Sequence, residues 1–280
     1  MRGLVILTPD SVKAGCWQYI YKDIESQLVI LDSFWVAPLP ISAVGSFYGW
    51  PESITFGMTL KARLFSLGMS YVLFVNSQSP HIDPSIVLNK LKGSSKLDDR
   101  SPETFRAKYG AINSFLNLIH TSDDSICAIR DYDVLLNYKL KATYNKYFSD
   151  PVHCDLCVKD IFIYYANIVF CRAIITVMSK VTTGYLGSGD GTSLVMPPNN
   201  HNYSTVRQWL AMLAFRFKQL KDNSAILVNT LCEWNKFSPF VSKQLPILLD
   251  EANVIIDDWT LLILQTSIYS KILTDNKECL

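Results

Sequence analysis

The chain has 280 residues, which is long enough for two hydrophobic cores of ordinary size. Hydrophobic residues make up 49% of the sequence and charged residues 18%, a composition that excludes a largely disordered chain. The formal net charge of +1 gives no general attraction for nucleic acid or for an anionic membrane, so neither is expected as a partner.

The cysteines and the N-terminus indicate the cellular compartment. The seven cysteines are odd in number and scattered along the chain. Residues Met1–Leu7 run directly into an apolar strand pattern without the features of a signal peptide. The most membrane-like stretch, Ile161–Met178, is interrupted by Asn167 and Arg172, which favours a buried helix. We therefore expect reduced thiols and a cytoplasmic protein without a membrane segment.

The first half of the chain alternates short apolar runs with helical patterns. Strands are predicted at Gly3–Leu7, Leu28–Val36, Tyr71–Asn76 and Phe115–Ile119. Helices are predicted at Ser11–Ser26 with Asp10 as its cap, at a segment ending near Tyr48, at Thr59–Leu67, at Pro84–Lys92 and at Ser125–Leu140. This order suits an α+β domain of the ferredoxin-like kind, in which helices pack on an antiparallel sheet.

The second half of the chain has a different pattern, and Asp150-Pro151 marks the predicted boundary between domains at residues 1–149 and 150–280. Helices are predicted at Leu156–Lys180, Ser204–Asp222, Ser224–Phe237 and Ser242–Leu273, the last with a break at Pro246. The loop Gly184–Tyr203 is rich in Gly, Pro and Asn. The second domain is therefore predicted to be an all-α helical bundle.

A histidine follows the predicted strand Phe115–Ile119 directly, in the run Asn117-Leu118-Ile119-His120-Thr121-Ser122-Asp123. A side chain at the end of a buried strand is held rigidly and can still face a cleft. This Asn-x-x-His-x-Ser-Asp pattern, downstream of Arg106, resembles the active-site strand of the nucleoside diphosphate kinases. The run Thr8-Pro9-Asp10-Ser11-Val12-Lys13-Ala14-Gly15 resembles the first strand-to-helix turn of that family, Lys-Pro-Asp-x-Val-x-x-Gly. The resemblance covers about the first half of the chain.

The resemblance implies catalytic roles for four residues. His120 matches the family's histidine, which takes the terminal phosphoryl group of a nucleoside triphosphate, and a neutral imidazole is a good nucleophile. Asp131 falls where a glutamate hydrogen-bonds the ring, although its side chain is one methylene shorter. Asn117 and Ser122 align with residues that bind the ribose or steady the site.

The resemblance also implies a set of binding residues and partners. Arg106 and Ser95 match phosphate-binding positions, Tyr48 matches a tyrosine near the phosphohistidine, and Phe56 is a candidate to stack on the base. ATP or another nucleoside triphosphate is the implied substrate, accompanied by Mg²⁺, for which the sequence contains no ligand set. The family commonly forms oligomers, so a homo-oligomer is a candidate assembly.

Two departures from the family pattern remove positive charge. Thr8 stands where the family has the lysine of Lys-Pro-Asp, and Asn89 stands near the place of a second phosphate-binding arginine. Phosphoryl transfer depends on charge stabilisation, so each missing cation is expected to lower the rate. Lys13 and Lys90 are the candidates to replace the missing charge, as are Lys96 and Arg100 further along the chain.

The sequence therefore predicts a nucleotide-dependent phosphotransferase that works through a phosphohistidine, with either a nucleotide or a specialised acceptor. Two alternatives stay open. One is a catalytically weak nucleotide-binding module whose helical half binds a partner, and the other is a nucleotidyl-transferring tailoring enzyme that uses the same cleft. His153–Cys157, which contains a Cys-x-x-Cys pair, and the glycine-rich Gly187–Ser193 are interpreted as ordinary thiols and a flexible connection.

Overall fold

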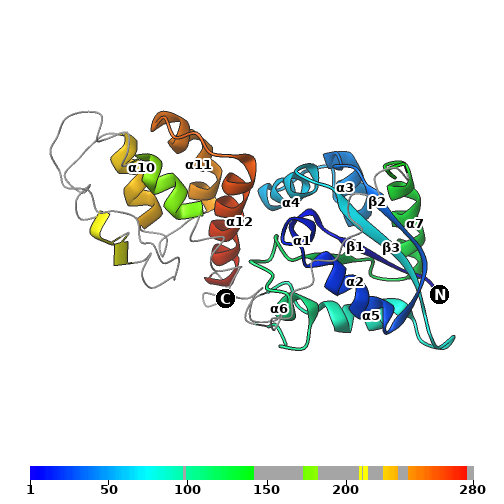
Figure 1. The fold of residues 1–280 in the computed structure, drawn as a ribbon. Coiled ribbons are helices and arrows are strands. Elements are labelled where there is room, and N and C mark those ends of the chain that lie inside the picture. The colour runs from blue at the N-terminus through cyan, green and yellow to red at the C-terminus, as the bar shows by residue number, and fades with distance from the viewer. Residues whose placement is uncertain are drawn as a thin grey trace. The chain divides into compact units, whose positions relative to one another are not determined.

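A computed structural model of the chain describes residues 1–96, 99–141, 173–181, 208–209, 211–213, 223–232 and 239–275. The chain divides into two compact units, Met1–Ile163 and Tyr164–Leu280 (Figure 1). The predicted domain boundary at residues 149–150 lies outside the described residues. So do the Cys-x-x-Cys pair at residues 154–157 and the glycine-rich run at residues 187–193.

A four-stranded antiparallel sheet forms the centre of the first unit (Figure 1). Its strands are β1 (Gly3–Leu7), β2 (Leu28–Val36), β3 (Ser70–Ser77) and β4 (Ile119–Thr121). Their order in the sheet is β2-β3-β1-β4, so β1 and β3 are central and β2 and β4 are edges. Antiparallel pairing in this order confirms the predicted ferredoxin-like α+β fold.

Helices cover both faces of the sheet. Because side chains alternate across a strand, Val5 and Leu7 of β1 face one core, whereas Leu4 and Ile6 face the other. The first core is closed by α2 (Trp17–Glu25), α5 (Pro84–Lys92) and α6 (Phe105–Lys108). The second core is closed by α3 (Ile41–Tyr48), α4 (Phe56–Ser66) and α7 (Ser125–Leu136) (Figure 1).

The predicted helix Ser11–Ser26 is wrong, because this segment contains parts of two helices, α1 (Pro9–Lys13) and α2. Gly15 lies between them with φ of 73°, a left-handed conformation that ends a helix. Asp10 is also not the helix cap, since α1 begins at Pro9 and Asp10 lies inside it. Its carboxylate instead accepts hydrogen bonds from the Thr8 hydroxyl at 2.5 Å and from the Leu118 N–H at 2.9 Å.

The predicted strand Phe115–Ile119 is wrong as well, because β4 begins only at Ile119. Leu118 has φ of 70°, a conformation that costs a leucine roughly 1–2 kcal/mol and that interrupts a strand. Its N–H donates to Asp10 instead of a neighbouring strand. The side chain of Asn113 accepts the N–H groups of residues 115 and 116, both at 2.9 Å, which fixes a turn. His120 is therefore the middle residue of a short edge strand.

The described residues of the second unit are mainly helical. They include residues 173–181, α10 (Asn223–Cys232), α11 (Pro239–Glu251) and α12 (Asp258–Asp275). The predicted break at Pro246 is wrong, since Pro246 lies inside α11 and the chain leaves the helix at residues 252–257. Gln265 and Ser242 exchange two hydrogen bonds that join α12 to α11. Within the described segments, no helix is long and apolar enough to cross a membrane.

Candidate active site

A pocket of about 440 Å³ lies at the β4 edge of the sheet. Its lining combines one histidine with cationic, hydroxyl, amide and aromatic side chains. The lining residues are Tyr48, Trp50, Gly57, Met58, Lys61, Lys92, Ser95, Arg106, Ser114, Phe115, Asn117, His120, Thr121 and Asp123. Because β4 is an edge strand, helices from both layers contribute side chains to this one opening.

His120 is the central residue of this pocket. It is paired with Ile6 of β1, so its side chain projects from the same face of the sheet as Ile6. The ring packs against Phe47 and Tyr48 of α3, with ring-centroid distances of 5.4 and 4.6 Å. Its Nε2 atom is buried and has no hydrogen-bond partner among the described residues. Burial and nearby positive charges lower the pKa of His120 well below its usual value, so the imidazole is neutral at neutral pH.

Three cations from three different helices line the pocket: Lys61 of α4, Lys92 of α5 and Arg106 of α6. The exposed fractions of Lys61 and Arg106 are only 9% and 7%. Within the described part of the chain, none of the three has a carboxylate oxygen within 4.0 Å. A buried cation without a counter-ion is costly, so this arrangement suits a pocket that receives an anion.

Neutral oxygen atoms hold these cations in place. Lys61 Nζ donates to the carbonyl of Phe115 at 2.9 Å and to Asn117 Oδ1 at 3.2 Å. Lys92 Nζ donates to Thr121 Oγ1 at 2.7 Å. The Arg106 guanidinium donates to the carbonyls of residues 93, 117 and 119, at 2.7, 3.3 and 3.0 Å. These three hydrogen bonds leave two of its five N–H groups for a ligand.

The pKa values of the two lysines reflect this environment. Burial lowers the pKa of Lys61 to about 7, against the opposing attraction of Asp10. Burial and repulsion by Arg106 lower the pKa of Lys92 to about 8, against the attraction of Asp123. Both ammonium groups therefore titrate close to neutral pH, where a bound anion would favour their charged forms.

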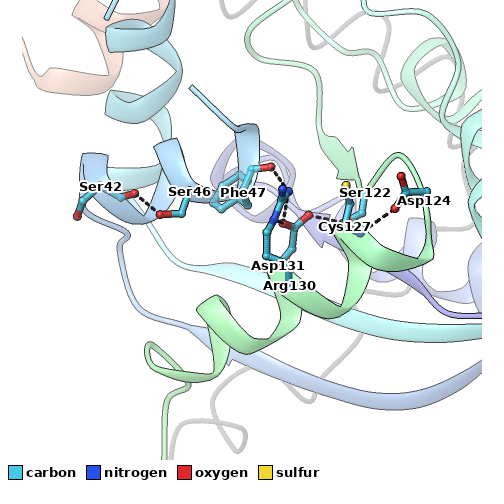
Figure 2. Close-up of polar contacts among 8 residues, drawn as sticks. All are labelled: Ser42, Ser46, Phe47, Ser122, Asp124, Cys127, Arg130 and Asp131. Atoms are coloured by element: carbon cyan, nitrogen blue, oxygen red, sulfur yellow. Dashed lines mark hydrogen bonds and ion pairs between the residues drawn. The ribbon is translucent and has the colours of Figure 1, made fainter. Parts of the chain in front are cut away.

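A second polar network joins α7 to α3 (Figure 2). Ser122 donates its hydroxyl proton to Asp131 Oδ2 at 2.5 Å. Arg130 donates to Asp131 Oδ1 at 2.9 and 2.7 Å and to the carbonyl of Phe47 at 3.1 Å. Among the described hydrogen bonds, none joins Asp131 to the His120 ring. The network reaches the neighbourhood of the ring through Arg130, which bonds both Asp131 and the carbonyl of Phe47, whose ring packs against His120.

The structure brings together half of the ten residues that the sequence predicted for the site. Those that line the pocket are His120, Asn117, Arg106, Ser95 and Tyr48. The network beside the pocket contains Ser122 and Asp131. The residues outside the pocket lining are Phe56, which begins α4 next to the lining residue Gly57, and the exposed Lys13 and Lys90.

Sequence reasoning missed Lys61, Lys92 and the aromatic wall residue Trp50, which stacks on Tyr48 at 5.6 Å with an interplanar angle of 15°. A signal for Lys61 was available, because it interrupts an otherwise apolar helical face of α4. Lys92 lies three residues after Asn89, one turn along α5. Both contact Thr121, since Thr121 donates to Asn89 Oδ1 at 3.3 Å and accepts from Lys92.

The loop that carries Ser95 is fixed by Arg100. Its guanidinium donates to the carbonyls of residues 94, 95, 111 and 113, at 3.3, 3.2, 2.6 and 3.1 Å. We expect Arg100→Met to lower the free energy of unfolding by roughly 1–3 kcal/mol, because four carbonyls lose their donor. Hydrogen exchange should also become faster at the amides of residues 94–96.

A control variant is available in the same loop. Among the described residues, the side chain of Lys96 makes only a solvent-exposed ion pair with Asp99, at 3.8 Å. Lys96→Met should change the free energy of unfolding by less than about 0.5 kcal/mol. Equal effects of the two substitutions in denaturant titrations would show that Arg100 does not hold the loop.

The fold and the pocket define a class of protein: an α+β domain of ferredoxin-like topology with a neutral histidine in a cation-lined pocket at the sheet edge. No protein-family model and no curated protein sequence matches the chain. Its first half is similar to solved structures of nucleoside diphosphate kinases, as the sequence motifs predicted.

Three of these structures show the extent of the likeness. The kinase of Encephalitozoon cuniculi is 20% identical, with a TM-score of 0.43, and the match covers 52% of this chain and 97% of that one. The kinase of Halobacterium salinarum is 18% identical, with a TM-score of 0.43 and coverages of 54% and 99%. The kinase of Borrelia burgdorferi is 18% identical, with a TM-score of 0.40 and coverages of 50% and 90%. At this identity the comparison concerns the fold and assigns no role to any residue.

Proposed function

We propose that this protein is a nucleotide-dependent phosphotransferase in which His120 carries the phosphoryl group. One observation carries the proposal: among the described residues, a neutral histidine whose buried nitrogen has no hydrogen-bond partner shares its pocket with three cations that have no carboxylate oxygen within 4.0 Å. The histidine supplies a nucleophile, and the cations supply the charge that a polyphosphate requires. Nucleotide interconversion and transfer to a specialised acceptor both fit this pocket.

In the first half of the proposed reaction, an imidazole nitrogen of His120 attacks the terminal phosphorus of a nucleoside triphosphate. The N–P bond forms as the bond from phosphorus to the bridging oxygen breaks, and the nucleoside diphosphate leaves with that electron pair. In the second half, an acceptor oxygen attacks the phosphohistidine and the imidazole becomes free again. Lys61, Lys92 and the two remaining N–H groups of Arg106 stabilise the charge on the phosphate oxygens.

Magnesium fits this pocket as part of the substrate. Among the described residues, no group of three His, Cys, Asp or Glu side chains is placed to hold a metal ion. Asp123 is the one carboxylate in the described pocket lining. Phosphate oxygens and water would therefore supply most ligands of a Mg²⁺ ion that enters with the nucleotide, which is a common mode of Mg²⁺ binding.

Incubation with Mg²⁺ and ATP labelled in the γ-phosphate tests this function. We expect the protein to become labelled on His120, with a bond that acid cleaves and base does not. His120→Gln should remove the label, whereas His81→Gln, which changes an exposed histidine outside the pocket lining, should retain it. Binding of ATP without any labelling would favour the catalytically weak binding module, and label from the α-phosphate would favour nucleotidyl transfer.

A further inference from the structure

The ammonium group of Lys61 is held in place without a direct ion pair among the described residues. It donates two of its three N–H groups, to the Phe115 carbonyl and to Asn117 Oδ1, and it lines the pocket. Asp10 attracts it through space, while the Asp10 oxygens accept their hydrogen bonds from Thr8 and Leu118. One N–H group of a buried cation is therefore left for a ligand in the pocket.

The position of Lys61 matches the place where the sequence lacks a cation. Thr8 is fully buried and donates its hydroxyl to Asp10, so it offers no charge to the pocket. Helix α4 packs against α1, the helix that follows Thr8, and the charge of Lys61 lies close enough to Asp10 for the two groups to attract each other. A positive charge thus reaches the neighbourhood of the β1–α1 turn from a different helix.

We propose that Lys61 is the cation that holds a polyphosphate beside the β1–α1 turn, in place of the lysine absent at position 8, and that this binding is coupled to the uptake of a proton. The choice of a polyphosphate rests on the function proposed above. The coupling follows from geometry, because the buried ammonium group has no carboxylate oxygen within 4.0 Å among the described residues and lines the pocket that the ligand enters.

The charged groups around Lys61 determine the direction of the coupling. Asp10 on α1 favours its charged form, whereas Arg106 on α6 and Lys92 on α5 oppose it, and the neutral ring of His120 on β4 adds no charge. Burial is the largest effect and lowers the pKa of Lys61 to about 7. A bound polyphosphate raises that pKa, so affinity is full below pH 7 and falls as the pH rises above 7.

The experiment measures binding of ADP without Mg²⁺ to the full chain at pH 6 and pH 9. Lys61→Met should weaken binding roughly ten- to a hundredfold at pH 6, where wild-type Lys61 is already charged. The ratio of wild-type to variant affinity should shrink to a few-fold at pH 9, and taking the ratio cancels the titration of ADP itself. Lys90→Met, which removes an exposed lysine outside the pocket lining, should bind as the wild type does at both pH values.

A second measurement on the wild type needs no substitution at a buried site. Calorimetry at pH 8 in buffers of different ionisation enthalpy should detect net proton uptake on ADP binding, because Lys61, with a pKa of about 7, and Lys92, with a pKa of about 8, are both partly neutral there before binding. An equal loss of affinity by Lys61→Met at pH 6 and pH 9, or binding by the wild type without proton uptake, would overturn the proposal. A pH-dependent affinity ratio between the wild type and Lys61→Met, without labelling of His120, would instead leave Lys61 assigned and refute the phosphotransferase function.

Discussion

Replacing His120 by glycine is expected to lower the rate of phosphoryl transfer at least about a thousandfold, because the reaction loses its nucleophile. ADP affinity should change by less than about threefold, since Lys61, Lys92 and Arg106 stay in place and the histidine is neutral. Single-turnover kinetics with labelled ATP and binding by calorimetry measure the two effects separately.

Added imidazole provides a sharper form of this test. In the wild type the ring packs against Phe47 and Tyr48, so His120→Gly should leave a space of imidazole size beside the cations. Free imidazole should occupy it and restore part of the transfer by accepting the phosphoryl group itself. Unchanged transfer in the glycine variant, before any imidazole is added, would contradict the role assigned to His120.

Gly93→Ala is expected to have the largest effect on stability. A Cβ atom at residue 93 would lie 2.4 Å from Thr104 Cβ and Oγ1, and the φ angle of +78° is strained for alanine. The carbonyl of Gly93 also accepts a hydrogen bond from Arg106 at 2.7 Å, so the backbone cannot move away without releasing that guanidinium. We expect the free energy of unfolding to fall by roughly 2–5 kcal/mol, from left-handed strain and steric overlap together.

Gly49→Ala is the matched control for this substitution. Gly49 also has a left-handed φ, of +60°, but a Cβ atom there would meet nothing within 4 Å. Its cost should be only the backbone strain, roughly 1–2 kcal/mol in denaturant unfolding. Equal costs at the two glycines would mean that Thr104 moves aside without penalty. Of the two variants, only Gly93→Ala should lower the affinity for ADP. The reason is that the Gly93 carbonyl, unlike Gly49, accepts a hydrogen bond from Arg106.

Elements with a simple pattern could be predicted from the sequence. Gly3–Leu7 is an apolar run, and Leu28–Val36 is apolar except for Asp32 and Ser33. Pro84–Lys92 begins with a proline that follows the capping residue Asp83. All three elements have the predicted bounds. Prediction failed where a distant residue decides the backbone. The turn at Leu118 depends on Asp10, which is 108 residues away in the chain, and local periodicity contains no trace of that contact.

The candidate site was predictable to a similar degree. The order of the motif residues indicated His120, Asn117 and Arg106, because such motifs preserve the residues that face a ligand. Lys61 and Lys92 belong to helices whose other residues form cores, and sequence spacing does not reveal which helix end meets an edge strand. The positive charges that tertiary packing brings to the pocket could therefore not be predicted from the sequence. The positive charge that is missing from the motif could be.

The position of the pocket at an edge strand has an evolutionary consequence. Lys61 and Lys92 line the pocket from helices in opposite layers of the domain, so more than one helix can supply a positive charge to the same position. The electrostatic stabilisation of a ligand depends on the potential at that point and not on which helix supplies the charge. A protein with this fold can therefore lose a cation from one helix and gain one on another while the electrostatic potential at the ligand stays the same. A search for the sequence motif would detect only the loss.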